Sequence, residues 1–227
     1  MSEIIAPIAH IYNGYQDKFG IPRQAGLVEE AVSQLIFEPP YNTPDAFRGL
    51  EGFSHLWLIW GFSQAKKADF SPTVRPPRLG GNTRVGVFAT RSPFRPNRLG
   101  LSCVALAEIE HHPQKGIVLH VKGADLMNGT PIYDVKPYLP FADSKPEATG
   151  GFANDALAHR LEVKMPVELA ALLTPPELLA LKGILAQDPR PSYQNDPQRV
   201  YGVTYAGVNV KFRVENDTAI VISAEQA

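Results

Sequence analysis

The residues best suited to chemistry lie in one basic stretch, PTVRPPRLGGNTRVGVFATRSPFRPNRLGLS, between positions 72 and 102. A guanidinium group binds phosphate or carboxylate through two parallel hydrogen bonds, and no acidic residue in the stretch compensates the arginines. Pro96 has a fixed φ and favours an extended Arg95, so Arg95 and Asn97 project from a stiff backbone. We therefore expect a preorganised anion-binding site. The arginines are Arg75, Arg78, Arg84, Arg91, Arg95 and Arg98.

The chain as a whole does not share this positive charge. Its formal net charge is −1 and its pI is about 6.6. A general polyanion binder is strongly basic, so any affinity for nucleic acid must come from a local patch and a shaped pocket. The alternative is that the arginines form only a solvated basic surface, which is the usual role of a charge cluster without a motif.

Length and composition predict a soluble globular protein. The chain has 227 residues, of which 44% are apolar and 20% are charged, and no apolar run reaches the roughly 18 residues of a membrane span. The N-terminal sequence MSEIIAPIAH lacks the basic and apolar regions of a secretory signal. A single cysteine excludes an intrachain disulfide. These features favour a cytoplasmic location.

The cysteine and histidine patterns indicate neither a thiol nucleophile nor a metal site. Cys103 lies in an alternating apolar run with Leu101 and Ala105, which favours a small buried hydrophobic residue over a nucleophile. The histidines form no HExxH motif and have no cysteine partners at metal-binding spacing. We therefore expect no metal.

The positions of the β-rich runs predict a mainly β fold in the first two thirds of the chain. Such runs are bounded by Gly, Pro or Asn, and their short, alternating character favours a barrel or a sandwich. A GxGxxG motif that opens a helix is absent, so a Rossmann-type site is disfavoured. A short helix is expected to begin at Thr43 and to end near Gly49 or Gly52. The predicted strands cover Ile4–Ile11, Ser54–Phe62, Thr83–Ala89, Leu101–Glu110 and Gly116–Lys122.

A second, smaller unit follows a linker at about residues 143–151, which are rich in Gly and small polar residues. The capping box of Thr174 and Glu177, with proline in the first turn, predicts a helix that continues through Leu185. Alternating runs after position 199 predict a small antiparallel hairpin or meander. We therefore expect a domain at 1–143 and a small α+β domain at 144–227, which docks on the first domain or on a partner.

Six segments together resemble the TrmO family, also described as TsaA-like or YaeB-like. The resemblance implies a single-sheet β-barrel, a homodimer and, with the last segment, the two-domain bacterial form. It also implies an S-adenosylmethionine-dependent methyltransferase that modifies the exocyclic amine of threonylcarbamoyl-adenosine at tRNA position 37. The segments are PRQ at 22–24, LEGFSHLW at 50–57, RPPRLGGN at 75–82, GVFATRSPFRPNRLGLS at 86–102, ADLMNGTPIYDVKPYLPFAD at 124–143 and AQDPRPSY at 186–193.

The resemblance also implies a set of cofactor-binding residues. Arg91 suits the carboxylate of the cofactor, and Leu101 suits a face of its adenine. Local pattern alone gives other interpretations: Leu101 in an alternating run is usually a core residue, and Asn128–Gly129 is typical of a β-turn. The implied residues are Gln24, Ala25, Gly26, Ser63, Gln64, Arg91, Leu101, Asp125, Leu126, Asn128, Gly129 and Thr130.

Methyl transfer is an in-line displacement, so an enzyme chiefly aligns donor and acceptor and excludes water. The acceptor nitrogen of the modified adenosine is a poor nucleophile, and a nearby carboxylate would help to remove its proton. We expect Asp134 to be this group, with Lys136 on the same strand face, Tyr138 stacking on or bonding to the base, and Asn97 holding the acceptor. The alternative is that Asp134 and Lys136 form an ordinary surface ion pair.

Two anions are available to the arginines in this interpretation: the threonine moiety of the substrate and the tRNA phosphates. Loop bases of RNA commonly stack on aromatic side chains, for which Phe94, Tyr133 and Tyr193 are candidates. The rival functions are a non-catalytic RNA-binding module and a phosphate-ester hydrolase, although the usual metal or nucleophile sets of a hydrolase are absent from the sequence. The expected substrate-binding residues are Arg75, Arg78, Arg84, Arg95 and Arg190.

Overall fold

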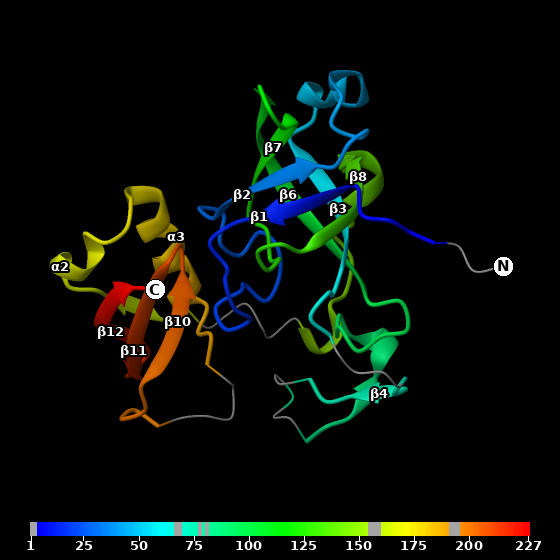
Figure 1. The fold of residues 1–227 in the computed structure, drawn as a ribbon. Coiled ribbons are helices and arrows are strands. Elements are labelled where there is room, and N and C mark those ends of the chain that lie inside the picture. Colours follow the sequence, from blue (N-terminus) through cyan, green and yellow to red (C-terminus); the bar gives the residue numbers. More distant parts are fainter. Residues whose placement is uncertain (1–3, 66–69, 77–78, 80–81, 154–159, 191–195) are drawn as a thin grey trace.

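The structure, a computed structural model, describes residues 4–65, 70–76, 79, 82–153, 160–190 and 196–227. Figure 1 shows a barrel and a smaller C-terminal unit side by side, with the long connection that carries strand β4 projecting away from the barrel. Arg78 and Tyr193 lie outside the described residues, so the predictions for these two side chains have no structural counterpart here.

The first unit is a closed barrel in which six strands follow the order β1-β2-β7-β6-β3-β8. Alternation of apolar and polar residues places every second side chain inside, where they form one buried cluster. The prediction of a mainly β protein built on a barrel is therefore confirmed. The strands are β1 (Ala9–Tyr12), β2 (Val32–Phe37), β3 (His55–Gly61), β6 (Leu99–His112), β7 (Gly116–Lys122) and β8 (Pro131–Pro137).

The structure corrects the prediction of which alternate residues of strand β6 point into the barrel. Ser102 and Val104 point into the barrel and are buried, whereas Leu101 is 53% exposed. Cys103 is only partly buried, so the predictions of a buried Cys103 and, from pattern alone, of a core Leu101 are wrong. Both sets of alternate residues contain apolar side chains around these positions. The alternation by itself therefore does not decide which face of the strand turns inward.

Several boundaries also differ from the prediction. The first strand begins at Ala9 rather than Ile4, and β2 and β8 were not among the predicted strands. In place of a strand over Thr83–Ala89, a two-residue strand β5 pairs with β4 and a 3-10 helix follows. The short elements of this connection are β4 (Thr73–Val74), β5 (Val85–Gly86) and η4 (Val87–Ala89).

The helix expected at Thr43 is present as two short 3-10 helices. The first, η1 (Pro44–Phe47), has proline at its start. The second, η2 (Leu50–Gly52), follows Gly49, whose φ of 90° suits glycine. After β8, the short helix α1 (Pro140–Asp143) closes the first unit, and Asp143 accepts hydrogen bonds from the Leu139 backbone and the Trp57 indole at 2.8 and 3.0 Å.

The C-terminal unit is a four-stranded sheet, in the order β10-β11-β12-β9, that packs against helix α3 (Pro175–Ala186). The predicted helix start is confirmed, because the Glu177 carboxylate accepts the Thr174 backbone N–H at 2.9 Å. The sheet contains the predicted meander and adds β9, which pairs in parallel with β12. The remaining elements are β9 (Glu162–Lys164), α2 (Val167–Ala170), β10 (Tyr201–Tyr205), β11 (Val208–Glu215) and β12 (Thr218–Gln226).

The two units share buried contacts through the segment between β1 and β2. Tyr15, Val28 and Ala31 belong to the buried cluster of the C-terminal unit. The Arg23 guanidinium adds hydrogen bonds to the carbonyl oxygens of Asp188 and Arg190 at 3.2 and 3.1 Å. The expected docking of the small unit on the first one therefore uses residues from the N-terminal part of the chain. None of the helices in the described ranges has the length and apolar character that a membrane span requires.

Candidate functional site

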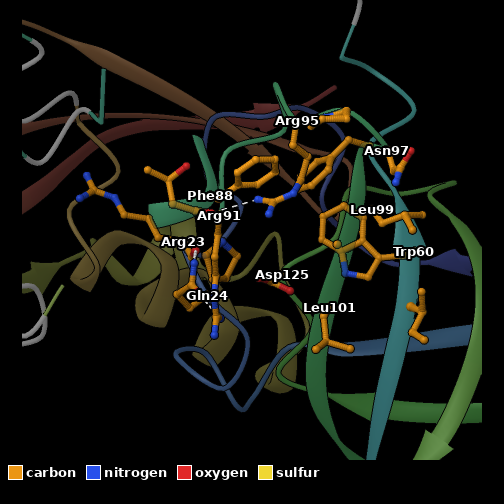
Figure 2. A pocket seen from close by; sticks show the side chains of 16 residues that line it. Arg23, Gln24, Trp60, Phe88, Arg91, Arg95, Asn97, Leu99, Leu101 and Asp125 are labelled. Atoms are coloured by element: carbon orange, nitrogen blue, oxygen red, sulfur yellow. Dashed lines mark hydrogen bonds between the residues drawn. The ribbon is translucent and has the colours of Figure 1, made fainter. Parts of the chain in front are cut away.

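A hollow of about 720 Å³ lies where strands β3 and β6 meet the loop at 88–97. Figure 2 shows Trp60, Leu99 and Leu101 along one side of it, Arg91 and Gln24 on the other, and Asp125 between them. The wall is therefore apolar on the barrel side and basic on the loop side. We call this hollow the first pocket; its other lining residues include Arg23, Ile59, Phe62, Phe88, Thr90, Arg95, Pro96, Asn97 and Gly100.

A second pocket of about 480 Å³ adjoins the first. Trp60, Phe62 and Asp125 line both pockets. The second pocket is lined mainly by apolar side chains, with Lys18 as a basic member. Asp125 is therefore an acidic side chain at the junction of two connected hollows. The remaining lining residues include Ile21, Gly61, Ser63, Gln64, Ala65, Pro93, Phe94, Met127 and Thr130.

A chain of two hydrogen bonds leads from strand β3 through Ser102 on strand β6 to the Asp125 carboxylate. The Trp60 indole N–H donates to the Ser102 hydroxyl at 2.9 Å, and that hydroxyl donates to Asp125 Oδ1 at 2.5 Å. Burial raises the pKa of Asp125 above its ordinary value, while the Ser102 hydrogen bond, the Arg91 guanidinium and the Ala25 backbone N–H partly offset the increase. A partly buried carboxylate whose charge is only partly compensated favours a cationic ligand nearby.

The loop side of the first pocket is held by its own polar contacts. The Arg91 guanidinium donates to the Gln24 side-chain oxygen, and the Arg95 guanidinium donates to the Thr90 carbonyl at 3.0 Å. Asn97 lies at the rim in Figure 2. These contacts orient two guanidinium groups toward one space, which fits the expectation that this loop is preorganised.

A third hollow of about 900 Å³ lies between the basic loop and the C-terminal unit, and it shares Arg91 with the first pocket. Arg84 donates to the Thr73 hydroxyl at 2.9 Å. Arg190 makes a bidentate ion pair with Asp188 at 2.8 and 2.9 Å, so its guanidinium already has an anionic partner. The hollow is lined by residues that include Arg23, Arg75, Arg84, Arg91, Arg190, Phe19, Phe94 and Phe152.

Comparison with known proteins identifies the family. The tRNA-methyltransferase O N-terminal domain matches residues 10–144, and the TrmO C-terminal domain matches residues 158–227. The chain belongs to the tRNA-methyltransferase O family. It is a methyltransferase enzyme, as the similar proteins and structures below also indicate.

One relative, the tRNA (adenine(37)-N6)-methyltransferase of Escherichia coli (strain K12), is 46% identical over 215 residues, which is 91% of each chain. The protein of the same name from Eikenella corrodens is 49% identical over 170 residues, 74% of this chain and 95% of that one. A crystal structure of TrmO from Pseudomonas aeruginosa is 32% identical, with a TM-score of 0.80, and covers 100% of this chain and 98% of that one. This likeness extends across both units of the fold.

The cofactor-binding residues expected from the TrmO family fall mostly around the two connected pockets. Gln24, Arg91 and Leu101 line the first pocket, Ser63, Gln64 and Thr130 line the second, and Asp125 lines both. Gly26 is held beside the barrel by a 2.8 Å hydrogen bond from its N–H to the Gly123 carbonyl. Its φ of 79° explains why glycine is suited to this turn.

The remaining residues of the expected cofactor loop support its shape. Leu126 is buried in the barrel cluster. The Asn128 side-chain oxygen accepts the Asn13 backbone N–H at 3.0 Å, and Gly129 has a φ of 76°, as the β-turn interpretation required. Leu126, Asn128 and Gly129 do not line either pocket, so the structure places them as supports rather than as pocket walls.

The expected catalytic group around Asp134 lies apart from the pocket walls. Asp134 and Lys136 form a 2.9 Å ion pair that is about half exposed on the outer face of β8, and Tyr138 lies 5.7 Å from the Trp57 ring between centroids. Ile59 connects the two regions, because it lines the first pocket and pairs directly with Asp134 across the strands. Of the four expected catalytic residues, Asn97 lines the first pocket, whereas Asp134, Lys136 and Tyr138 line none of the three hollows described above.

The sequence interpretation missed Trp60, Phe62 and Ser102, although all three contribute to the site. Trp60 and Ser102 lie at inward positions of β3 and β6, where a polar hydroxyl in a barrel interior calls for a partner. A serine at an inward position of a barrel strand would have indicated Ser102, but the sequence does not show which residues of β6 point inward. Among the described residues, no cluster of three His, Cys, Asp or Glu side chains forms a metal site.

Proposed function

We propose that this enzyme transfers the methyl group of S-adenosylmethionine to the N6 amine of adenosine 37 of tRNA, in its threonylcarbamoyl form. The names of the relatives support the reaction: the proteins of Escherichia coli and Eikenella corrodens are tRNA (adenine(37)-N6)-methyltransferases. A relative in Pseudomonas aeruginosa is called a putative S-adenosylmethionine-dependent methyltransferase. The observation on which the proposal depends is the pair of connected pockets with Asp125 at their junction.

The residues around the two pockets suit the chemical parts of this cofactor. The cofactor supplies a methyl group on a sulfonium cation. Asp125 offers a partly buried carboxylate for a positive charge, and Arg91 offers a guanidinium for a carboxylate. Trp60 and Leu101 offer apolar surface for an adenine ring. We propose that Gln24, Ser63, Gln64 and Thr130 contact the same cofactor from the pocket walls. The other expected residues line neither pocket, and we propose that they support the loops that hold the cofactor: Ala25, Gly26, Leu126, Asn128 and Gly129.

For the acceptor, we propose that Asn97 at the rim holds the amide groups of the modified adenosine and that Arg95 binds its threonine carboxylate. Asp134, Lys136 and Tyr138 lie on the outer face of the barrel. They reach an acceptor only if that acceptor extends past Ile59 or if a second subunit brings it to this face.

A homodimer, which we also propose, would cover this outer face. Leu101 is 53% exposed and Phe88 is 74% exposed beside the first pocket, and apolar exposure of this kind at a polar rim is typical of a contact surface. In such a dimer, Asp134 would act as the proton acceptor in a site completed by both subunits.

The third hollow suits the anticodon loop that surrounds the target base. Arg75 and Arg84 supply positive charge for phosphates, and Phe94 supplies a ring on which a base can stack. Arg190 also lines the hollow, although its ion pair with Asp188 must rearrange before it binds a phosphate. We propose that these side chains position the tRNA without reading its sequence, in the cytoplasm where tRNA is modified.

One experiment tests the reaction. The protein is incubated with labelled S-adenosylmethionine and with tRNA that carries or lacks the threonylcarbamoyl group, and the nucleosides are then analysed. We expect label only in the modified adenosine at position 37. Calorimetric titration with S-adenosylmethionine separates this function from a non-catalytic RNA-binding module, because a folded protein that releases no heat of binding would contradict the enzyme interpretation.

A further inference from the structure

We infer that Ser102 and Trp60 act as a pair of positioning residues, which hold the Asp125 carboxylate at the junction of the two pockets as the acceptor for a cationic ligand. The inference rests on the proposed function, since the cation it concerns is the sulfonium of the cofactor. It assigns a role to two residues for which the sequence predicted none: Ser102, which acts through Asp125, and Trp60, which acts through Ser102 in addition to lining both pockets.

The direction of the hydrogen bonds is determined by the groups themselves. An indole N–H only donates, so the Ser102 oxygen must accept from Trp60 at 2.9 Å. A hydroxyl has one proton, and the remaining partner at 2.5 Å is Asp125 Oδ1. The Ser102 proton is therefore directed at Asp125 and is not free to turn elsewhere. A donor fixed in this way favours the ionised form of the carboxylate.

The barrel strands are built to hold this arrangement. Ser102 is 2% exposed and Trp60 is 7% exposed. Trp60 pairs across the strands with Gly100, and a Cβ atom at position 100 would lie only 2.3 Å from Trp60 Cε2. The indole therefore lies directly against the backbone of β6, in a space that only glycine leaves open. This close packing keeps the indole N–H within reach of Ser102.

The surroundings of Asp125 show what remains if Ser102 is lost. The charged and titratable groups that act on it are the Arg91 guanidinium from the basic loop and the Tyr15 phenol from the segment after β1; Lys18 is the basic residue of the second pocket. The Ala25 backbone N–H is an additional donor. Of the groups that lower the pKa of Asp125, Ser102 has the largest effect after burial has raised it. None of these groups donates to Asp125 Oδ1 from the side of strand β6, as Ser102 does.

The chain offers a matched control in Ser33. Both serines are buried on barrel strands, at 1% and 2% exposure. The Ser33 hydroxyl makes no hydrogen bond to any residue that the structure describes, whereas the Ser102 hydroxyl makes two. Ser33→Ala thus removes a buried hydroxyl without touching Asp125. Any effect of Ser102→Ala that Ser33→Ala lacks is specific to the hydrogen-bonded chain.

The experiment measures binding, not turnover. Calorimetric titrations with S-adenosylmethionine and with S-adenosylhomocysteine, which lacks the positive sulfur, are made for wild type, Ser102→Ala, Ser102→Thr and Ser33→Ala over a range of pH. Without its Ser102 donor, Asp125 holds a proton at higher pH. We therefore expect Ser102→Ala to lose about tenfold in affinity for the sulfonium ligand on the acid side. The difference in affinity between wild type and Ser102→Ala should become smaller as pH rises. The affinity for S-adenosylhomocysteine, the neutral thioether, should change by less than about twofold.

A second readout does not depend on any ligand. Carbon NMR of labelled aspartate follows the titration of Asp125 in the protein alone, and we expect its pKa to rise in Ser102→Ala and to stay unchanged in Ser33→Ala. Ser102→Thr retains a hydroxyl and should restore most of the wild-type behaviour, which a loss of packing alone would not explain.

The outcomes separate this inference from the proposed function. If wild type binds neither ligand, the proposed function fails. If wild type binds S-adenosylmethionine but Ser102→Ala matches Ser33→Ala in both titrations, the positioning role is wrong while the function stands. If Ser102→Ala loses equal affinity for the charged and the neutral ligand and the titration of Asp125 is unchanged, Ser102 serves only the structure of the barrel, and the inference is overturned.

Discussion

At the scale of single residues, two aspartates of one motif differ because of their surroundings. Asp125 is partly buried between two pockets and accepts a hydrogen bond from Ser102. Asp134, nine positions on in the same motif, lies half exposed in an ion pair with Lys136. A partly buried carboxylate whose charge is only partly compensated attracts a cationic ligand, whereas an exposed ion pair is screened by solvent and contributes little by itself. We therefore expect different losses when each is removed.

The first prediction concerns this division. Asp125→Ala should weaken binding of S-adenosylmethionine before it affects anything else, because the two pockets lose the one acidic side chain that lines them among the described residues. Asp134→Ala should leave that affinity within about twofold and lower turnover, since an interaction made mainly in the transition state changes kcat rather than binding. Calorimetry and single-turnover kinetics on both variants check this, and an equal loss of affinity in both would contradict it.

The second prediction concerns stability and pH. The pKa of Asp125 lies above its ordinary value because of burial, so the folded state holds this proton more tightly than the unfolded chain. The stabilisation that results is therefore fully present at pH values below the pKa of Asp125 in the unfolded chain. It is lost as pH rises through the pKa of Asp125 in the folded state. Asp125→Asn, which carries no charge, should melt at an equal or higher temperature than wild type at pH 8. The difference in melting temperature between Asp125→Asn and wild type should be smaller at pH 4. Thermal melts of both proteins at the two pH values measure this difference.

At the scale of elements, the connection between β3 and β6 matters more for function than its sparse secondary structure suggests. It supplies Arg91 and Arg95 to the first pocket and Arg75 and Arg84 to the third. Short contacts to its own backbone and to Gln24 replace regular pairing as the means of orienting these side chains. A loop that carries function on a rigid scaffold is a common arrangement, and here the scaffold is the barrel.

The third prediction tests one of these loop residues. Arg91→Ala should reduce the affinity for S-adenosylmethionine by about tenfold or more, because it would remove the charge-assisted hydrogen bond that we propose between Arg91 and the carboxylate of the cofactor. The melting temperature should change little, since the loop adds few residues to either core. The control is Arg48→Ala, which removes an exposed guanidinium paired with Asp45; it should leave binding unchanged. A large fall in the melting temperature of Arg91→Ala would show that the loop is structural instead.

At the scale of the whole molecule, the two units depend on each other. The C-terminal core includes Tyr15, Val28 and Ala31, which precede most of the barrel in the chain. Arg23 bonds to two carbonyls of the C-terminal unit, and its neighbour Gln24 bonds to Arg91 in the first pocket. Arg23 also lines the first pocket, so one side chain contacts both the C-terminal unit and the candidate cofactor site.

The fourth prediction uses two buried valines. Val28 and Val104 are each 1% exposed, but Val28 belongs to the C-terminal core and Val104 to the barrel core. Val28→Ala should therefore speed hydrogen exchange in β10–β12, although it lies in the N-terminal part of the chain, at a cost of about 1 to 3 kcal/mol for the lost methyl groups and the cavity. Val104→Ala should speed exchange in the barrel instead. Reversed patterns would contradict the shared core.

What the sequence by itself determined was the family, the mainly β character and the helix that begins after Thr174, because ordered motifs and capping residues are local signals. Most residues expected around the cofactor do line the two pockets. The tertiary structure decided which side of β6 faces inward, since alternation reveals a period of two but not its phase, and barrel closure selects the phase. For the same reason Ser102 became a partner of Asp125, while Leu101 turned outward. Asp134 lies on β8, where an irregular pairing with β3 places it opposite Ile59 and outside the pocket walls. Long-range pairing also decided the parallel contact of β9 with β12.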